Sequence, residues 1–230
     1  MREKEIDDVL NTGPDVDPSL VDHIARSIGS SAAPVKPLLP SWMLAGALIL
    51  ICGALATAGA SILGFHGIVK MNAIEIGLIF SVLAGLIWLC AVLCVAEHVP
   101  GSRRPVSPTL MVVGGCLALT AVFAALFHNY SVHRFLPRGV ACLIAGLAQA
   151  IPVSLATWWL LSRGFALNPL TAGLIKGTLA GFAGVAMLEL HCGNFEAPHV
   201  MIWHTAVIPI SGAFGAFVAW TTRNRKSRPV

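Results

Sequence analysis

The stretch IGLIFSVLAGLIWLCAVLCVA, residues Ile76–Ala96, decides the fold class, because it contains no Asp, Glu, Lys or Arg over its whole length. A helix of about 20 apolar residues is long enough to cross the hydrocarbon core of a bilayer. Similar stretches predict further spans at Trp42–Leu63, Thr109–Phe127, Gly139–Leu161, Leu170–Glu189 and Val200–Thr221. Unbroken apolar runs exclude the alternating pattern of a membrane barrel. The sequence therefore predicts an all-α membrane protein, a bundle of six transmembrane helices.

The composition of the whole chain agrees with a membrane protein. Hydrophobic residues make up 56% of the 230 residues and charged residues only 11%, whereas soluble domains carry about 25% charged residues. Most of the charges lie before Trp42 and after Thr221. We therefore expect three parts: an acidic head with a proline-rich linker over residues 1–40, a six-helix transmembrane domain over residues 41–222, and a basic tail over residues 223–230.

Lysine and arginine residues predict the orientation, because cytoplasmic loops carry more of them. The second loop, the fourth loop and the tail are basic, and the fifth loop has no Lys or Arg. The side of the membrane with the second loop, the fourth loop and the tail has Arg103, Arg104, Arg163, Arg223, Arg225, Lys226 and Arg228. The opposite side has Lys70, Arg134 and Arg138. We expect a multi-pass protein with both termini in the cytoplasm. The net charge of +4 follows from this topology, and we expect no direct contact with nucleic acid.

The head contains a predicted amphipathic helix. Asp17 suits its N-cap, Pro18 its first turn, and Gly29 the position just past its end. Its apolar side chains recur at helical spacing and form what we call the head stripe: Leu20, Val21, Ile24 and Ile28. An earlier short helix would place Ile6, Val9 and Leu10 on one face.

The head stripe needs a partner, because a helix this short is unstable alone. Residues 1–28 carry seven acidic side chains against three basic ones. This excess disfavours anionic lipid and favours a basic protein on which the segment folds. The alternative is a solvated leader without a partner.

Two of the six cysteines differ from the rest. Cys52, Cys90, Cys94 and Cys116 fall inside spans, where cysteine behaves as a small hydrophobe. Cys142 and Cys192 are predicted at similar depth near the outer surface, which is the oxidising side. The pair is therefore interpreted as a disulfide, as thiols that respond to metal or oxidant, or as packing residues.

Three histidines accompany the second of these cysteines. His191, Cys192, His199 and His204 form a candidate metal site, because Cys and His together suit soft or borderline metals. Their spacing matches no established zinc pattern. The alternative is that these side chains pair with one another or with interfacial water.

The fifth span contains a run of closely spaced glycines. Gly173, Gly177 and Gly181 form two overlapping GxxxG steps, which are typical of close helix packing. The contact is predicted either within the bundle or with a second copy, in a homodimer.

Motifs for catalysis are missing from the sequence, so we do not expect an enzyme. There is no nucleotide-binding loop, nucleophile elbow or HExxH motif. Two other functions stay open: a small-molecule or metal transporter with a Cys/His outer site, and a membrane oxidoreductase that passes electrons through Cys142 and Cys192. Against transport, no acidic residue is predicted at mid-membrane depth.

Several motifs between about Pro137 and Arg223 carry a family resemblance. They are Cys142, Ile151-Pro152, the loop from Ser162 to Pro169, Leu190-His191-Cys192 and Trp203-His204, with support from the linker Pro34 to Leu38. In these motifs the chain resembles the NrsF family of bacterial membrane anti-sigma factors. The family usually has Pro-Glu after the second cysteine, where this chain has Gly193-Asn194.

This resemblance implies a role in transcription regulation and stress response. Such proteins have six membrane helices and hold an extracytoplasmic-function sigma factor inactive at the bacterial inner membrane. The family's periplasmic cysteine pair, implicated in sensing metal or oxidative stress, corresponds by position to Cys142 and Cys192. We therefore expect a sigma factor and membrane lipid as partners, with the sigma factor on the head stripe. We expect no resident cofactor, only transient heavy-metal binding at the two cysteines.

Overall fold

A computed structural model describes residues 17–31, 39–99, 101–162, 164, 166 and 168–226. The chain divides into two compact units. One contains the short helix α2 (Pro18–Ser31). The other contains α3 (Ser41–Leu63), α4 (Ala73–Ala96), α5 (Pro108–Leu126), α6 (Phe135–Leu161), α7 (Pro169–His191), α8 (Ala197–His199), the π-helix η1 (Val200–His204) and α9 (Thr205–Lys226).

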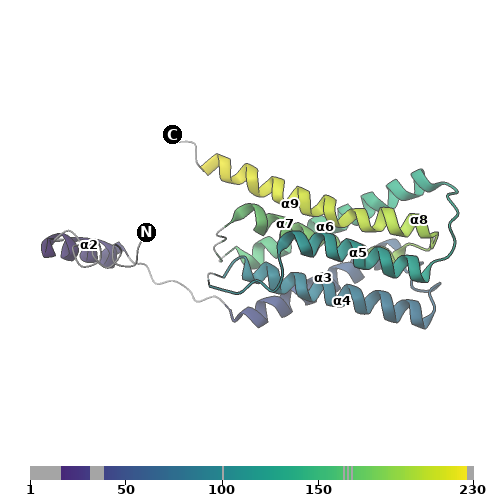
Figure 1. The fold of residues 1–230 in the computed structure, drawn as a ribbon, viewed down its shortest axis with the longest axis horizontal. Helices are drawn as coiled ribbons and strands as arrows, with labels where there is room; N and C mark the ends of the chain where they lie inside the picture. Colours follow the sequence, from purple (N-terminus) through teal and green to yellow (C-terminus); the bar gives the residue numbers. More distant parts are fainter. Residues whose placement is uncertain are drawn as a thin grey trace, which may run out of the picture. The chain divides into compact units, whose positions relative to one another are not determined.

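The described part of the chain is helical and contains no β-strand, only an isolated bridge between Asn129 and Glu196. Six of its helices are long and apolar enough to cross a membrane, the last one running through α8, η1 and α9. These helices run side by side along the bundle (Figure 1). The prediction of an all-α, six-helix membrane protein is therefore confirmed.

In the head, the start of α2 agrees with the prediction and its end does not. The Ser19 amide donates a hydrogen bond of 2.9 Å to the Asp17 carboxylate, as expected of an N-cap. The predicted end before Gly29 is wrong, because the helix continues to Ser31. Glycine lowers helix stability by only about 1 kcal/mol, so a single glycine does not always end a helix. The predicted earlier helix with Ile6, Val9 and Leu10 lies outside the described residues, as does most of the linker.

Capping residues fix where several long helices begin. The Asn72 side chain accepts hydrogen bonds from the first turn of α4, while Glu75 accepts one of 2.8 Å from the Asn72 amide. The side chains of Ser107 and Asn168 also accept hydrogen bonds from the first turns of α5 and α7. The largest error in the start of a predicted span, four residues, is at α6. This helix starts at Phe135, ahead of Arg138, because the first turn of a membrane helix tolerates charged residues outside the apolar core.

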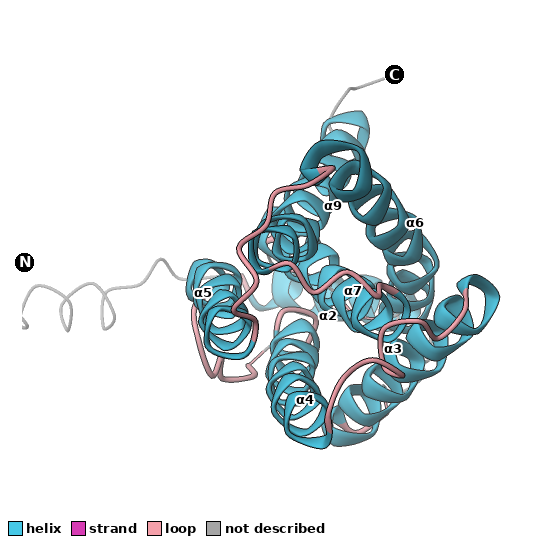
Figure 2. Ribbon diagram, turned by 90° about the vertical axis from the view of Figure 1, so that its right-hand side faces the viewer, coloured by secondary structure: helices cyan, strands magenta, loops and turns pink. Residues whose placement is uncertain are grey.

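Helix α7 lies at the centre of the bundle. In its most apolar stretch 78% of the residues are buried inside the protein, against 22–44% in the other five spans. An end-on view shows α3, α4, α5, α6 and α9 around it (Figure 2). The other helices therefore meet lipid on one side, whereas α7 meets protein almost all round.

The glycines of α7 form a close contact with α9. A Cβ atom at Gly173 would overlap the Gly215 carbonyl, and one at Gly177 would overlap the Ser211 carbonyl. At Gly181 it would lie 2.7 Å from the Ile208 Cα atom. We call this contact the glycine seam. Of the two contacts that the sequence left open, the one within the bundle is the one observed, because α9 of the same chain occupies this face.

A buried acidic residue lies at the end of the bundle where α7 begins. The Glu97 side chain, just after α4, is completely buried and forms an ion pair of 2.8 Å with Arg104. Thr171, in the first turn of α7, donates a hydrogen bond of 3.0 Å to the same carboxylate. This contact, not predicted from the sequence, joins the start of α7 to the loop between α4 and α5.

The glycine seam predicts how sensitive the fold is to added volume. Gly177→Ala should lower the free energy of unfolding by about 1–3 kcal/mol, because the new methyl group must displace the Ser211 backbone. Chemical unfolding in detergent, followed by helical circular dichroism, measures the change.

Gly85→Ala is the matched control, since a Cβ atom there meets nothing within 4 Å. It should leave the stability unchanged or slightly raised, because alanine favours helix. Equal stability of the two variants would contradict the close packing of α7 on α9.

Candidate thiol and histidine site

Cys142 and Cys192 meet at one end of the bundle. Cys142 lies about two turns into α6, and Cys192 directly follows α7. Their sulfur atoms are 3.4 Å apart, although the residues are 50 positions apart in sequence. This end is opposite the one where α3 begins and α9 ends (Figure 1). The structure thus brings the predicted cysteine pair into direct contact.

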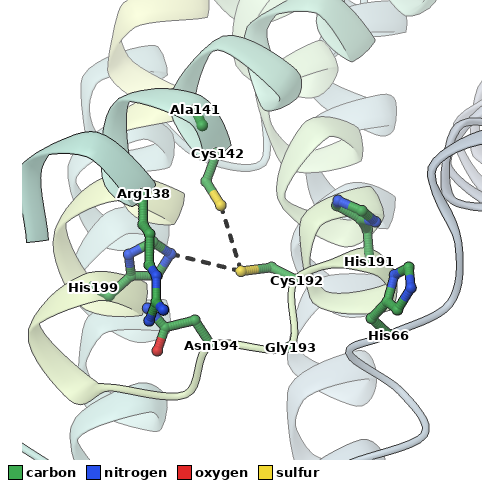
Figure 3. A pocket seen from close by; sticks show the side chains of 9 residues that line it. All are labelled: His66, Arg138, Ala141, Cys142, His191, Cys192, Gly193, Asn194 and His199. Atoms are coloured by element: carbon green, nitrogen blue, oxygen red, sulfur yellow. Dashed lines mark hydrogen bonds between the residues drawn. The ribbon is translucent and has the colours of Figure 1, made fainter. Parts of the chain in front are cut away.

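Two histidines complete a compact group with these cysteines. One ligand atom from each of Cys142, Cys192, His199 and His204 lies within 4.8 Å of the others. The Cys192 sulfur lies 3.6 Å from Nε2 of His199 (Figure 3). Both imidazole rings are completely buried, and Cys142 is partly exposed. We call these four residues the thiol–imidazole cluster.

The π-helix η1 explains why both histidines point to the same place. Residues five positions apart in an α-helix lie about 140° apart around its axis. The wider turn between Val200 and His204 brings the rings of His199 and His204 to a centroid distance of 5.3 Å. π-Helical turns are rare and often mark functional sites.

A buried carboxylate fixes the second histidine. Nδ1–H of His204 donates a hydrogen bond of 2.6 Å to Oε1 of Glu189, and neither side chain is exposed. The other ring nitrogen, Nε2, makes no hydrogen bond of ordinary geometry to any described residue, although the ring interacts with the thiol of Cys192.

His191 lies outside the cluster, although the sequence interpretation placed it among the metal ligands. Its Nδ1–H donates a hydrogen bond of 2.9 Å to the Gly64 carbonyl, and its ring packs edge-on against His66. The physical reason is helical geometry, because adjacent residues such as His191 and Cys192 point in different directions. Its place among the four residues is taken by Cys142.

A shallow pocket of about 370 Å³ opens beside the cluster. Its wall includes Cys142, Cys192 and His199, and Arg138 and His191 also line it (Figure 3). The two sulfur atoms are therefore within reach of a small solute at this end of the protein.

The surroundings of Cys192 shift the pKa of its thiol above the ordinary value. Its hydrogen bond with Cys142 and its burial raise the pKa of Cys192, and these effects outweigh the neighbouring histidines, which lower it. A raised pKa means less thiolate and slower reaction with electrophiles at pH 7.

The predicted partner-binding residues all lie on α2. Leu20, Val21 and Ile24 are exposed by about half, at 51%, 51% and 47%. The side chain of Ile28 is outside the described part of the structure. The three described side chains of the head stripe are thus accessible within their own unit.

Two features of the site were not predicted from the sequence. The first is the contact between His204 and Glu189, the last residue of the fifth predicted span. The second is the π-helical turn that places His199 and His204 on the same side of their helix. Such a turn has no clear periodic pattern in the sequence. A single acidic residue at the end of an otherwise apolar span was the signal for Glu189, because such a residue needs a partner.

The fold and the site together define a helical membrane protein with a buried thiol and histidine centre at one end. The family model "NrsF: Negative regulator of sigma F" matches residues 29–222. The chain therefore belongs to the NrsF family, whose name describes a negative regulator of a sigma factor and not an enzyme. No curated protein and no solved structure was found to match the chain.

The contact between the cysteines predicts a disulfide on oxidation. Mild oxidation of the reduced, purified protein should join Cys142 to Cys192, because the sulfur atoms need to close from 3.4 Å to about 2.05 Å. Alkylation followed by peptide mass spectrometry identifies the linked peptides.

Cys116→Ser should form the same disulfide, since Cys116 lies elsewhere in the bundle, in α5. Cys142→Ser should leave Cys192 open to alkylation after oxidation. A Cys192 that stays free in the oxidised wild-type protein would contradict the geometry.

Proposed function

We propose that the protein is an integral anti-sigma factor of the bacterial inner membrane, which holds an extracytoplasmic-function sigma factor inactive. Membership of the NrsF family carries this proposal, because the match covers the whole helical bundle. A sigma factor bound at the membrane cannot reach core polymerase or promoter DNA. The family name favours this role over the transporter and the oxidoreductase that the sequence left open.

The orientation follows from the charges of the loops. With both termini in the cytoplasm, the start of α3 and the end of α9 face the cytoplasm. The thiol–imidazole cluster, at the opposite end of the bundle, then faces the periplasm. A signal that arises outside the cell reaches the two cysteines there without crossing the membrane.

The head stripe is the proposed contact for the sigma factor. Its described side chains are large, apolar and about half exposed, and they lie on a helix within the acidic part of the sequence. The family match begins at residue 29, so the contact rests on these properties and not on the match. An amphipathic helix of this kind lays its apolar face into a groove of its partner.

The two cysteines are the proposed sensor of metal or oxidative stress. Modification of Cys142 and Cys192 would change how α6 and the end of α7 lie against each other. Helix α7 also contacts Glu97 through Thr171 at its other end. Helix α7 is thus one packed element that runs from the two cysteines to the cytoplasmic end of the bundle. A shift in its position would change the balance between bound and released sigma factor.

The head stripe is tested by two acidic substitutions on its exposed face. Leu20→Asp together with Ile24→Asp should abolish repression, because two carboxylates would have to be buried without partners in the sigma contact. A sigma-dependent reporter strain measures the released activity.

Arg26→Asp is the matched control, since it makes the same change in net charge on the opposite face of α2. It should keep repression near the wild-type level. Full repression by the double variant, at normal protein level in the membrane, would remove the head stripe from the mechanism.

The sensing role predicts a separation of repression from response. Cys142→Ser and Cys192→Ser should each keep repression in unstressed cells and lose most of the induction by metal or oxidant. The same reporter strain measures both quantities, with Cys116→Ser as the control that should respond normally. Normal induction in both single variants would refute the sensor.

A further inference from the structure

We propose that Cys142, Cys192, His199 and His204 bind one divalent metal ion of the zinc type, and that Glu189 positions His204 for it. This deepens the proposed sensing function and rests on it for its biological purpose. The ion binding itself depends only on the four side chains, and it can be measured without the sigma factor.

The distances between the side chains fit a tetrahedral site. Bonds of about 2.3 Å to sulfur and 2.0–2.1 Å to nitrogen place tetrahedral ligands roughly 3.3–3.8 Å apart. The two sulfur atoms are 3.4 Å apart, and the Cys192 sulfur is 3.6 Å from His199. All four ligand atoms lie within 4.8 Å of one another, so small side-chain movements complete the coordination.

One ring nitrogen of His204 is buried without a hydrogen-bond partner of ordinary geometry in the described part of the chain. The ring of His204 is completely buried, and this nitrogen is Nε2. Buried polar atoms in folded proteins nearly always have a partner, so an exception needs an explanation. A metal ion bound at Nε2 supplies it.

Glu189 and His204 form the arrangement that commonly supports metal-bound histidines. A metal-ligating imidazole usually donates its other N–H to a carboxylate, which fixes the ring and its tautomer. Here Nδ1–H of His204 donates to Glu189 at 2.6 Å, within a site where neither side chain is exposed. Glu189 is therefore a positioning residue and not a ligand.

The ligand set selects the class of ion. Two thiolates and two neutral imidazoles suit zinc and similar soft or borderline cations, and they disfavour Mg²⁺ and Ca²⁺, which prefer oxygen. Binding of the ion would displace the thiol protons to solvent, and the two resulting thiolates would balance its charge, which lowers the cost of burying it. The pocket beside Cys142 and Cys192 gives the ion a path to the site.

Binding would tie together segments that are distant in sequence. Cys142 belongs to α6, whereas Cys192, His199 and His204 belong to the stretch that joins α7 to α9. The ion would therefore hold the end of α7 against α6. This gives the sensor a metal-bound state that differs from its oxidised state, in which only the two cysteines are joined.

The test is a titration of the full-length, reduced protein in detergent with Co²⁺, which reports tetrahedral thiolate coordination through its visible absorption. We expect one Co²⁺ per chain, displaced by Zn²⁺. Cys142→Ser, His199→Ala and His204→Ala should each raise the Kd at least tenfold. Glu189→Gln should raise it about 10- to 100-fold while the thiolate bands remain, because all four ligands are kept.

His191→Ala is the matched control, since this histidine lines the same pocket but lies outside the cluster. Its Kd should stay within twofold of the wild-type value. Helical circular dichroism and gel filtration verify that each variant is folded. The conservative Cys142→Ser and Glu189→Gln variants keep the test valid if a histidine variant misfolds.

Three results would overturn the inference: no Co²⁺ bound by the wild-type protein, wild-type affinity in folded His199→Ala or His204→Ala, or equal loss in His191→Ala. None of them would affect repression or oxidant-induced release in the reporter strain, which test the proposed function separately. Conversely, a protein that binds Co²⁺ as expected but does not repress would refute the proposed function alone.

Discussion

The rest of the structure depends on the close packing of α7 at the centre of the bundle. In lipid the hydrophobic effect does not drive helices together, so association depends on close contact between small residues. Gly173, Gly177 and Gly181 provide this contact by bringing the backbones of α7 and α9 together. Because α7 meets protein on nearly every side, its two ends are fixed by their neighbours: Thr171 at Glu97 and Cys192 at Cys142. This makes α7 suited to connect a sensor with the opposite face of the membrane.

The fold was largely predictable because the membrane restricts the possible structures. Long apolar runs with few or no charged residues identify all six helices, and several of them begin at capping residues such as Asn168. The glycine spacing also predicted close packing, but it did not distinguish a neighbour in the same chain from a second copy. That choice depends on which helix faces α7, a property of the tertiary arrangement that local spacing does not contain.

The site was predictable only in part, for geometric reasons. Topology placed Cys142 and Cys192 at similar depth, but it could not bring two sulfur atoms from different helices within 3.4 Å. His199 and His204 enter the cluster because the π-helical turn brings their rings together. His191 stays outside it because its side chain points towards Gly64. Neither feature has a periodic signal in the sequence.

The central claim is that the protein sequesters a sigma factor through its head, and a pull-down from native membranes tests it most directly. The full-length protein and a form lacking residues 2–33 would be purified in parallel, with bound proteins identified by mass spectrometry. The account predicts an extracytoplasmic-function sigma factor with the full-length protein and none with the shortened form. Absence of any sigma factor from both preparations would contradict it, and equal recovery with both would place the contact on the cytoplasmic loops instead of the head.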